Sequence, residues 1–324
     1  RQRQMCIRDS YITKAFTGAG GKFLAGFFAV SIILALGFMG CMVQSNSIAA
    51  TCNTAFGIPT WVMGLLIVFF AGLVFLGGVQ RLASVTEKLV PIMAIIYLIG
   101  GLVVLILNIQ NLPGAFALIF QCAFSPEAGI GGAFFGIVAA ITYGAKRGLF
   151  SNEAGMGSTP HAHALAKVKR PQDQGEIAIV SVFIDTFVVL TLTAMVILTS
   201  GMLNPGAPDG LQGTELAQAA FSASLGTLGG AFVAICMLFF AFSTIIGWYF
   251  FGEQNVKALF GHKAVKAYAA IVVVCIVIGS ALHVDLVWNL SDLFNGLMVF
   301  PNLIALLALS GLVAKAAHDK DIMK

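Results

Sequence analysis

Apolar stretches long enough to cross a lipid bilayer recur along almost the whole chain. A helix needs about 20 apolar residues to cross the hydrocarbon core, which is roughly 30 Å thick. Lipid supplies no hydrogen-bond partner to the backbone, so such stretches must be helices, because barrel strands would be shorter and would alternate in polarity. Hydrophobic residues make up 59% of the sequence and charged residues only 10%, which excludes an ordinary soluble domain. The sequence therefore predicts an all-α, polytopic membrane protein.

Eight membrane crossings are predicted, at residues 23–51, 58–78, 89–108, 132–165, 177–200, 228–251, 265–282 and 286–310. The basic residues support this count, because short cytoplasmic loops retain Lys and Arg while translocated loops lose them. Of the 18 Lys and Arg residues, all but Lys146 and Arg147 precede the first span or follow an even-numbered span. This alternation predicts that both ends of the chain lie on the cytoplasmic side of a plasma membrane.

Several function classes are excluded by what the sequence lacks. The net charge of +4 follows from the cytoplasmic bias of the basic residues, and no Arg-rich patch with interleaved aromatic residues indicates nucleic acid as a partner. The six cysteines show no CxxC spacing, and no HExxH, GxSxG or P-loop motif occurs. Neither an enzyme nor a bound cofactor is therefore expected.

The first ten residues, RQRQMCIRDS, do not begin with Met and match neither a signal peptide nor a targeting sequence. We expect residues 1–10 to be foreign to the natural chain, which would then have lost its beginning. Residues 11–324 are expected to form a single transmembrane domain, with a cytoplasmic tail at 314–324.

A polar stretch, GLFSNEAGMGSTPHAHA at 148–164, interrupts the fourth apolar span. Each glycine there weakens helix propagation by about 1 kcal/mol, and Pro160 lacks an amide donor, so a continuous helix is not expected. Broken helices expose amides and carbonyls with which transporters hold ions and charged substrate groups. Close helix packing is the alternative role of the glycines, but packing does not account for Ser151, Asn152 and Glu153 beside them. The sequence therefore predicts a broken helix.

Four charged residues inside predicted spans are candidates for a functional role: Arg147, Glu153, Asp185 and Asp292. Charged groups at membrane depth usually face a cavity or a partner. For Asp185 and Asp292, an ion pair that only holds helices together is an equally good interpretation. The histidines His161 and His163 lie about 200° apart around a helix axis and are not expected to bind one metal ion together.

The sixth span contains a second polar interruption at Ser243 and Thr244. Their hydroxyls and the carbonyl of Phe240 offer three oxygens to a hard cation such as sodium, although such hydroxyls often bond only to the preceding turn. Trp248 shares the helical face of Thr244 and is placed to wall a small-ligand pocket. In the first span, Gln44 offers a donor and an acceptor to a zwitterion, or equally to a neighbouring helix.

Four motifs in the sequence match one known family. They are RGLFSNEAG at 147–155 with Gly157-Ser158 and Pro160 following, QSNSIA at 44–49, FSTIIGW at 242–248, and FN at 294–295 with PNL at 301–303. By these motifs the chain resembles the alanine or glycine:cation symporter family. Thr159 replaces the small alanine that is usual in the family. The resemblance implies the leucine-transporter (APC superfamily) fold, which is built from two five-helix inverted repeats. This chain would hold the remainder of the first repeat at 11–128 and the second repeat at 129–313, with the first family helices missing.

The resemblance also implies a site. Gln44 would contact the amino acid, Phe150, Ser151, Asn152, Glu153 and Gly155 would line it at the break, and Thr244 and Trp248 would complete the pocket. Phe240, Ser243 and Thr244 would form half of a sodium site shared with a missing helix.

The implied function is sodium-coupled import of alanine or glycine across the plasma membrane of a prokaryote. Proton coupling through Glu153 or Asp185, and a channel or receptor, are the alternatives. The sequence predicts no oligomeric state.

Overall fold

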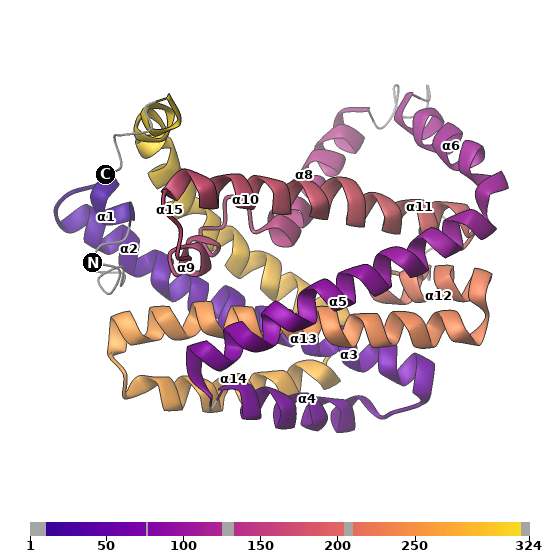
Figure 1. The fold of residues 1–324 in the computed structure, drawn as a ribbon, viewed down its shortest axis with the longest axis horizontal. Helices are drawn as coiled ribbons and strands as arrows, with labels where there is room; N and C mark the ends of the chain where they lie inside the picture. The colour runs from indigo at the N-terminus through magenta and orange to yellow at the C-terminus, as the bar shows by residue number, and fades with distance from the viewer. Residues whose placement is uncertain (1–10, 76, 125–132, 204–209, 319–324) are drawn as a thin grey trace.

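The computed structural model describes residues 11–75, 77–124, 133–203 and 210–318, and in these ranges every regular element is a helix. The expected foreign head, the expected repeat boundary at 128–129 and the end of the tail lie outside the described residues. In chain order the elements are α1 (Tyr11–Ala15), α2 (Ala19–Ile32), η3 (Ile33–Gly40), α3 (Cys41–Phe56), α4 (Thr60–Phe75), α5 (Gly78–Leu107), η4 (Ile109–Asn111), α6 (Leu112–Phe124), α8 (Ala133–Asn152), α9 (Pro160–His163), α10 (Pro171–Phe183), η5 (Ile184–Leu190), α11 (Thr191–Thr199), α12 (Gly213–Leu225), α13 (Thr227–Phe260), α14 (Ala264–Ala281) and α15 (Val284–His318) (Figure 1).

Six helical stretches in the described ranges are long and apolar enough to cross a membrane. They are Ala19–Phe56, Arg81–Leu107, Gln172–Thr199, Thr227–Phe260, Ala264–Ala281 and Val284–Lys315, and they match the predicted first, third, fifth, sixth, seventh and eighth spans. The chain is therefore a multi-pass membrane protein. The predicted second span is the shorter apolar helix α4, with 16 residues, and the predicted fourth span is divided between α8 and α9.

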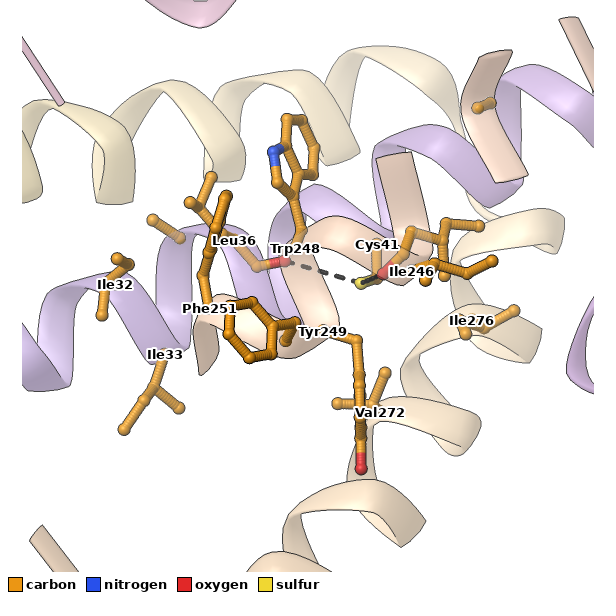
Figure 2. Close-up of a cluster of buried hydrophobic side chains, with 14 of the residues drawn as sticks. Ile32, Ile33, Leu36, Cys41, Ile246, Trp248, Tyr249, Phe251, Val272 and Ile276 are labelled. Atoms are coloured by element: carbon orange, nitrogen blue, oxygen red, sulfur yellow. Dashed lines mark hydrogen bonds between the residues drawn. The ribbon is translucent and has the colours of Figure 1, made fainter. Parts of the chain in front are cut away.

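Helix α13 lies in the middle of the molecule, where it packs against α3, η3, α14 and α5 (Figure 1). Its aromatic side chains Trp248, Tyr249 and Phe251 are buried in the largest apolar cluster, which Figure 2 shows in close-up. Side chains from α2, η3 and α14 belong to the same cluster, including Ile32, Ile33, Leu36, Val272 and Ile276. A helix that is apolar on all sides can bury its surface only against other helices or lipid, and the buried part of α13 lies against these helices.

Two π-helices, η3 and η5, continue without interruption into the α-helices on either side of them. A π-helix has wider turns, closed by hydrogen bonds between residues five apart, and occurs often at functional sites. Neither π-helix was predicted from the sequence, because no residue pattern separates them from the α-helical turns on either side.

Candidate functional site

The predicted helix break is confirmed: α8 ends at Asn152 and α9 begins at Pro160. Three residues between them have positive φ angles, namely Glu153 at 51°, Gly155 at 87° and Gly157 at 82°. Glycine adopts this conformation without strain, and proline is favoured at the first position of a helix, which Pro160 occupies. The residues that weaken a continuous helix therefore also build the loop that replaces it.

Glu153 is the one described non-glycine residue with a positive φ angle, a conformation that costs an L-residue about 1–2 kcal/mol. Its side chain compensates for this strain. One carboxylate oxygen accepts a hydrogen bond from the indole Nε1–H of Trp248, and the other accepts one from the Ser158 hydroxyl at 2.6 Å. Glu153 thus connects the loop to α13 and closes the loop on itself.

The loop is also held by α15 and α1. The amide nitrogen of Asn302 donates to the carbonyl of Gly155 at 2.5 Å, and the Tyr11 hydroxyl donates to the Asn302 amide oxygen. A Cβ atom on Gly157 would lie 2.8 Å from that amide oxygen and 2.7 Å from the Tyr11 hydroxyl, so only glycine fits there. Three parts of the chain that are far apart in sequence meet at this loop.

The two histidines after the break bind neighbouring helices. His161 Nδ1 lies 2.9 Å from the Ser158 carbonyl, and its Nε2 lies 3.0 Å from the amide nitrogen of Asn255 on α13. His163 Nδ1 lies 2.5 Å from the amide nitrogen of Gln174 on α10. Both imidazoles therefore help to position the chain after the break.

A cavity of about 640 Å³ opens beside the break. Four of the predicted substrate-lining residues line it: Ser151, Asn152, Glu153 and Gly155. Asp185 of η5 and Asn302 of α15 also line it, and the Ser151 hydroxyl donates to the Asp185 carboxylate at 2.6 Å. The volume lies in the range of small-molecule sites, and polar side chains form a minor part of a mainly apolar wall.

Phe150 does not line this cavity but belongs to an aromatic cluster next to it. Its ring meets that of Trp248 edge-on, with ring centres 5.3 Å apart, and lies 5.1 Å from the ring of Trp288 on α15. Since Trp248 also donates to Glu153, the cluster and the break are connected through one indole ring.

Gly40, at the end of η3, permits this position of Trp248. A Cβ atom on Gly40 would lie 2.5 Å from Cε3 of the indole. We expect Gly40→Ala to lower the stability of the protein by about 1–3 kcal/mol, the usual cost of overpacking a filled interior. The measurement is the midpoint temperature of unfolding in detergent. Gly26→Ala in α2 is the matched control, because no atom lies within 4 Å of its added methyl group, and equal midpoints for the two variants would contradict the prediction.

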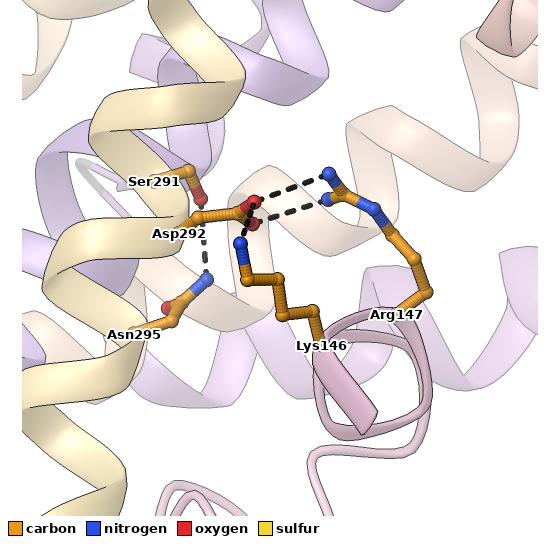
Figure 3. A network of polar contacts seen from close by, with 5 residues as sticks. All are labelled: Lys146, Arg147, Ser291, Asp292 and Asn295. Carbon is orange, nitrogen blue, oxygen red and sulfur yellow. Dashed lines mark hydrogen bonds and ion pairs between the residues drawn. The ribbon is translucent and has the colours of Figure 1, made fainter. Parts of the chain in front are cut away.

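Asp292 forms an ion pair, which was one of the two sequence-based interpretations. Arg147 on α8 donates to both of its carboxylate oxygens at 3.2 Å, and the Lys146 ammonium lies 4.0 Å away (Figure 3). The Arg147 guanidinium also lies over the Trp288 ring, 4.4 Å from its centre. The part of α8 before the break is thereby attached to α15.

The three predicted sodium-binding oxygens lie together on α13. The hydroxyls of Ser243 and Thr244 both donate to the Phe240 carbonyl at 2.9 Å. This is the bonding to the preceding turn that was the alternative interpretation. It uses the proton of each hydroxyl and leaves the lone pairs of both oxygens available to an ion. The buried Ser243 hydroxyl also lies 3.8 Å from the Met93 sulfur on α5.

Gln44, on α3, is not brought to the cavity, and its side chain makes no hydrogen bond with the described residues. Its neighbour Asn46 makes two, donating to the carbonyls of Gly279 at 2.9 Å and Leu282 at 2.8 Å. Asn46 thus satisfies carbonyls at the end of α14, which are left over when a helix ends.

A model of the sodium:alanine symporter family matches residues 9–321. The chain belongs to the sodium:alanine symporter family.

Its relatives in this family include a sodium/alanine symporter of Methanococcus maripaludis, which is 41% identical over 294 residues, covering 90% of this chain and 64% of the relative. A putative sodium/proton-dependent alanine carrier protein of Bacillus subtilis is 38% identical over 328 residues, covering 97% of this chain and 66% of the relative. A probable sodium/glutamine symporter of the same species is 40% identical over 303 residues, covering 93% of this chain and 62% of the relative. The chain thus spans about two thirds of the length of these relatives. The family consists of transporters and not of enzymes.

Among the residues that the family resemblance singled out, the structure places Ser151, Asn152, Glu153 and Gly155 in one cavity. Phe150 and Trp248 lie beside it, Thr244 lies one turn before Trp248 on α13, and Gln44 lies apart. No role was predicted for Ser158 or Trp288 from the sequence, and Asn302 was noted only as part of a motif. A polar residue in the interior of an apolar helix, as Asn302 is, was the signal available for that residue.

Proposed function

We propose that this chain is part of a sodium-coupled symporter that imports a small neutral amino acid, alanine or glycine, across the plasma membrane of a prokaryote. The observation that carries the proposal is the broken helix, whose Glu153 carboxylate accepts a hydrogen bond from Trp248 and lines a cavity together with Ser151 and Asn152. Membership of the family supports symport as the reaction, and the names of two relatives support sodium as the coupled ion and alanine as the substrate.

The cavity suits a zwitterion. Ser151 and Asn152 at the end of α8 offer oxygens to an ammonium group, and the amides of a helix break can bind a carboxylate. The family resemblance adds four residues that do not line this cavity in the structure: Phe150 and Trp248 beside it, and Thr244 and Gln44 farther away. Alanine and glycine differ by one methyl group, which changes affinity by only about 1–3 kcal/mol.

Sodium is proposed to bind at the Phe240 carbonyl and the hydroxyls of Ser243 and Thr244, with further ligands from elsewhere in the complete protein. Coupling requires that ion and substrate stabilise the same closed state. Trp248 lies one turn beyond Thr244 and donates to Glu153, which provides a short physical connection from this ion to the break.

The proposed architecture is the leucine-transporter fold with eight crossings in this chain, in which α4 and the broken pair α8 and α9 supply the two crossings beyond the six long helices. The distribution of Lys and Arg supports cytoplasmic ends. With this orientation the cavity, which His163 lines next to the basic loop at 167–170, opens toward the cytoplasm. The pair of Arg147 and Asp292 then lies on the outer side of the break.

The test is uptake of labelled alanine into vesicles that contain the protein expressed from its complete gene, with a sodium gradient or with choline in place of sodium. Import in sodium alone supports the proposal. Import driven by a proton gradient without sodium would favour the proton-coupled alternative, a mode that the name of one relative includes. A passive sodium current without alanine movement would favour a channel.

Replacing both hydroxyls, as Ser243→Ala with Thr244→Ala, is expected to raise the sodium concentration for half-maximal uptake about tenfold, since two of the ligands are lost. The matched control is Thr86→Ala on α5, whose hydroxyl also bonds to the preceding turn, at 3.0 Å from the Leu82 carbonyl. If the double variant and the control require the same sodium concentration, the hydroxyls serve only their own helix.

A further inference from the structure

An open groove of about 500 Å³ lies between the start of α2 and the end of α13. Helix α13 ends on the side of the molecule where α1 and α2 begin, and α13 and α2 pack against each other (Figure 1). The groove shares no lining residue with the cavity beside the break. Its wall consists of Lys22, Phe23, Gly26, Phe27 and Val30 of α2 and of Leu259 and Phe260 of α13. Of these residues only Lys22 carries a charge.

The groove runs along α2 from a charged end to an apolar end. Lys22, Gly26 and Val30 are four residues apart and therefore lie on one face of the helix. At 1.5 Å of rise per residue, Val30 lies about 12 Å beyond Lys22, and half of the hydrocarbon core of a bilayer is about 15 Å thick. In the proposed orientation Lys22 is at the cytoplasmic surface. The groove thus has the length of one lipid leaflet, with its charge at the level of the headgroups.

Gly26 leaves space in the middle of the groove. A Cβ atom on this glycine would meet no described atom within 4 Å, so neither helix packs on it. On either side of this space, Phe23 is 74% exposed and Phe260 is 66% exposed. Glycine is a poor residue for the interior of a helix, and here its missing side chain opens a gap between apolar walls. The gap fits a flexible apolar chain.

The charges around the groove favour an anion. Residues 11–75 contain no Asp or Glu, and Glu253, the last acid before the end of α13, is paired with Lys257 at 2.5 Å. Among the described residues no acid lies within 4.0 Å of the Lys22 ammonium. Lys22 also lies in the first turn of α2, where the helix dipole disfavours a cation and favours an anion. Lys263, three residues after Phe260, adds to the positive charge at this end.

We propose that this groove binds an anionic phospholipid of the cytoplasmic leaflet, with one acyl chain between α2 and α13 and the phosphate at Lys22. Basic pockets between membrane helices on the cytoplasmic side are typical sites for such headgroups. The inference goes beyond the proposed function and takes only the orientation from it. A bound lipid would hold the end of α13 against α2, whose Phe28 ring stacks on His161 after the break at 6.4 Å.

The test is the unfolding temperature, in detergent at low ionic strength, of the protein expressed from its complete gene. Three additives are compared: dioleoyl phosphatidylglycerol, dioleoyl phosphatidylcholine with the same chains but no net charge, and glycerol 3-phosphate without chains. Phosphatidylglycerol is expected to raise the unfolding temperature and the other two to have little effect, because a ligand that binds only the folded state stabilises it. High salt should reduce the shift, since it screens exposed charges.

Gly26→Leu fills the groove with a side chain. Leucine favours a helix more than glycine does and meets open space here, so the variant should fold and should lose most of the shift with phosphatidylglycerol. The matched control is Gly72→Leu in α4, where an added Cβ atom also meets no described atom within 4 Å. This control lies outside the groove and should keep the full shift.

Lys22→Gln removes the charge and keeps most of the side chain. The phosphatidylglycerol concentration for half of the shift should rise about fivefold, as expected for the loss of one lysine near an anionic lipid. The control is Lys88→Gln on α5, an exposed lysine outside the groove, which should leave this concentration unchanged.

Four outcomes would overturn the lipid site. Equal shifts with phosphatidylcholine would show that the charge is not recognised, and an equal shift with glycerol 3-phosphate would show that the acyl chain is not. A full phosphatidylglycerol shift in Gly26→Leu would place the lipid elsewhere. If Gly26→Leu, unlike Gly72→Leu, lowers the unfolding temperature without lipid, another helix of the complete protein fills the groove. Uptake of labelled alanine tests the proposed function separately, and its result does not alter these outcomes.

Discussion

Glu153→Ala is expected to reduce alanine uptake at least about a hundredfold. The alanine side chain loses the hydrogen bonds from Trp248 and Ser158, and bonds to a charged acceptor are worth about 1.5–3 kcal/mol each. The strained backbone at position 153, with φ at 51°, then has no compensating contact. The break should lose its single conformation, and with it the cavity that Ser151, Asn152 and Gly155 line. Initial rates of labelled alanine uptake, normalised to protein in the membrane, provide the measurement.

Three variants separate the causes. Glu153→Gln keeps one acceptor oxygen and should retain intermediate uptake. Glu153→Gly relieves the backbone strain while losing the same two hydrogen bonds, so full uptake by this variant would show that the carboxylate is dispensable. Glu215→Ala, at an exposed acid in the first turn of α12, is the control for a lost negative charge and should transport normally.

The second large effect is expected for Asp292→Asn, which leaves Arg147 and Lys146 facing α15 without a carboxylate. Breaking a buried ion pair costs about 3–5 kcal/mol, whereas an exposed pair is worth about 0–1 kcal/mol. The Asp292 side chain is 16% exposed and that of Arg147 is 43% exposed, so a cost of about 1–3 kcal/mol is expected between these limits. The unfolding temperature should fall, and uptake should fall with it, because α8 before the break is no longer attached to α15.

Exchanging the charges, as Arg147→Asp with Asp292→Arg, tests whether the pair itself is responsible. The exchanged protein should recover part of the stability that either single variant loses, since a coupling energy appears only between residues in contact. If the losses of the two single variants simply add, the pair makes no net contribution and the prediction fails.

The sequence predicted those features that depend on local chemistry alone. Six long apolar stretches became six candidate membrane helices, because length and polarity decide whether a helix can cross lipid. The break after Asn152 followed from glycines and one proline, whose backbone effects act within a few residues. The shared helical face of Thr244 and Trp248 on α13 was also predicted, since these residues are one turn apart.

The contacts between these elements were not visible in the sequence. That Glu153 would bond to Trp248, or Asn302 to Gly155, depends on how helices distant in sequence pack together. The charges illustrate the limit most clearly, because the sequence allowed the same two interpretations for Asp185 and Asp292. In the packed structure Asp292 pairs with two cationic side chains, whereas Asp185 accepts a hydrogen bond from a serine hydroxyl.

The distribution of the tryptophans makes the protein's own light emission a reporter of the site. Of the three tryptophans, Trp61 is 58% exposed on α4, while Trp248 and Trp288 lie on either side of Phe150 at the break. With Trp61 replaced by phenylalanine, all indole fluorescence would arise next to Glu153 and Arg147. A change in the emission wavelength would then follow the opening and closing of this region during a transport cycle, without any attached dye.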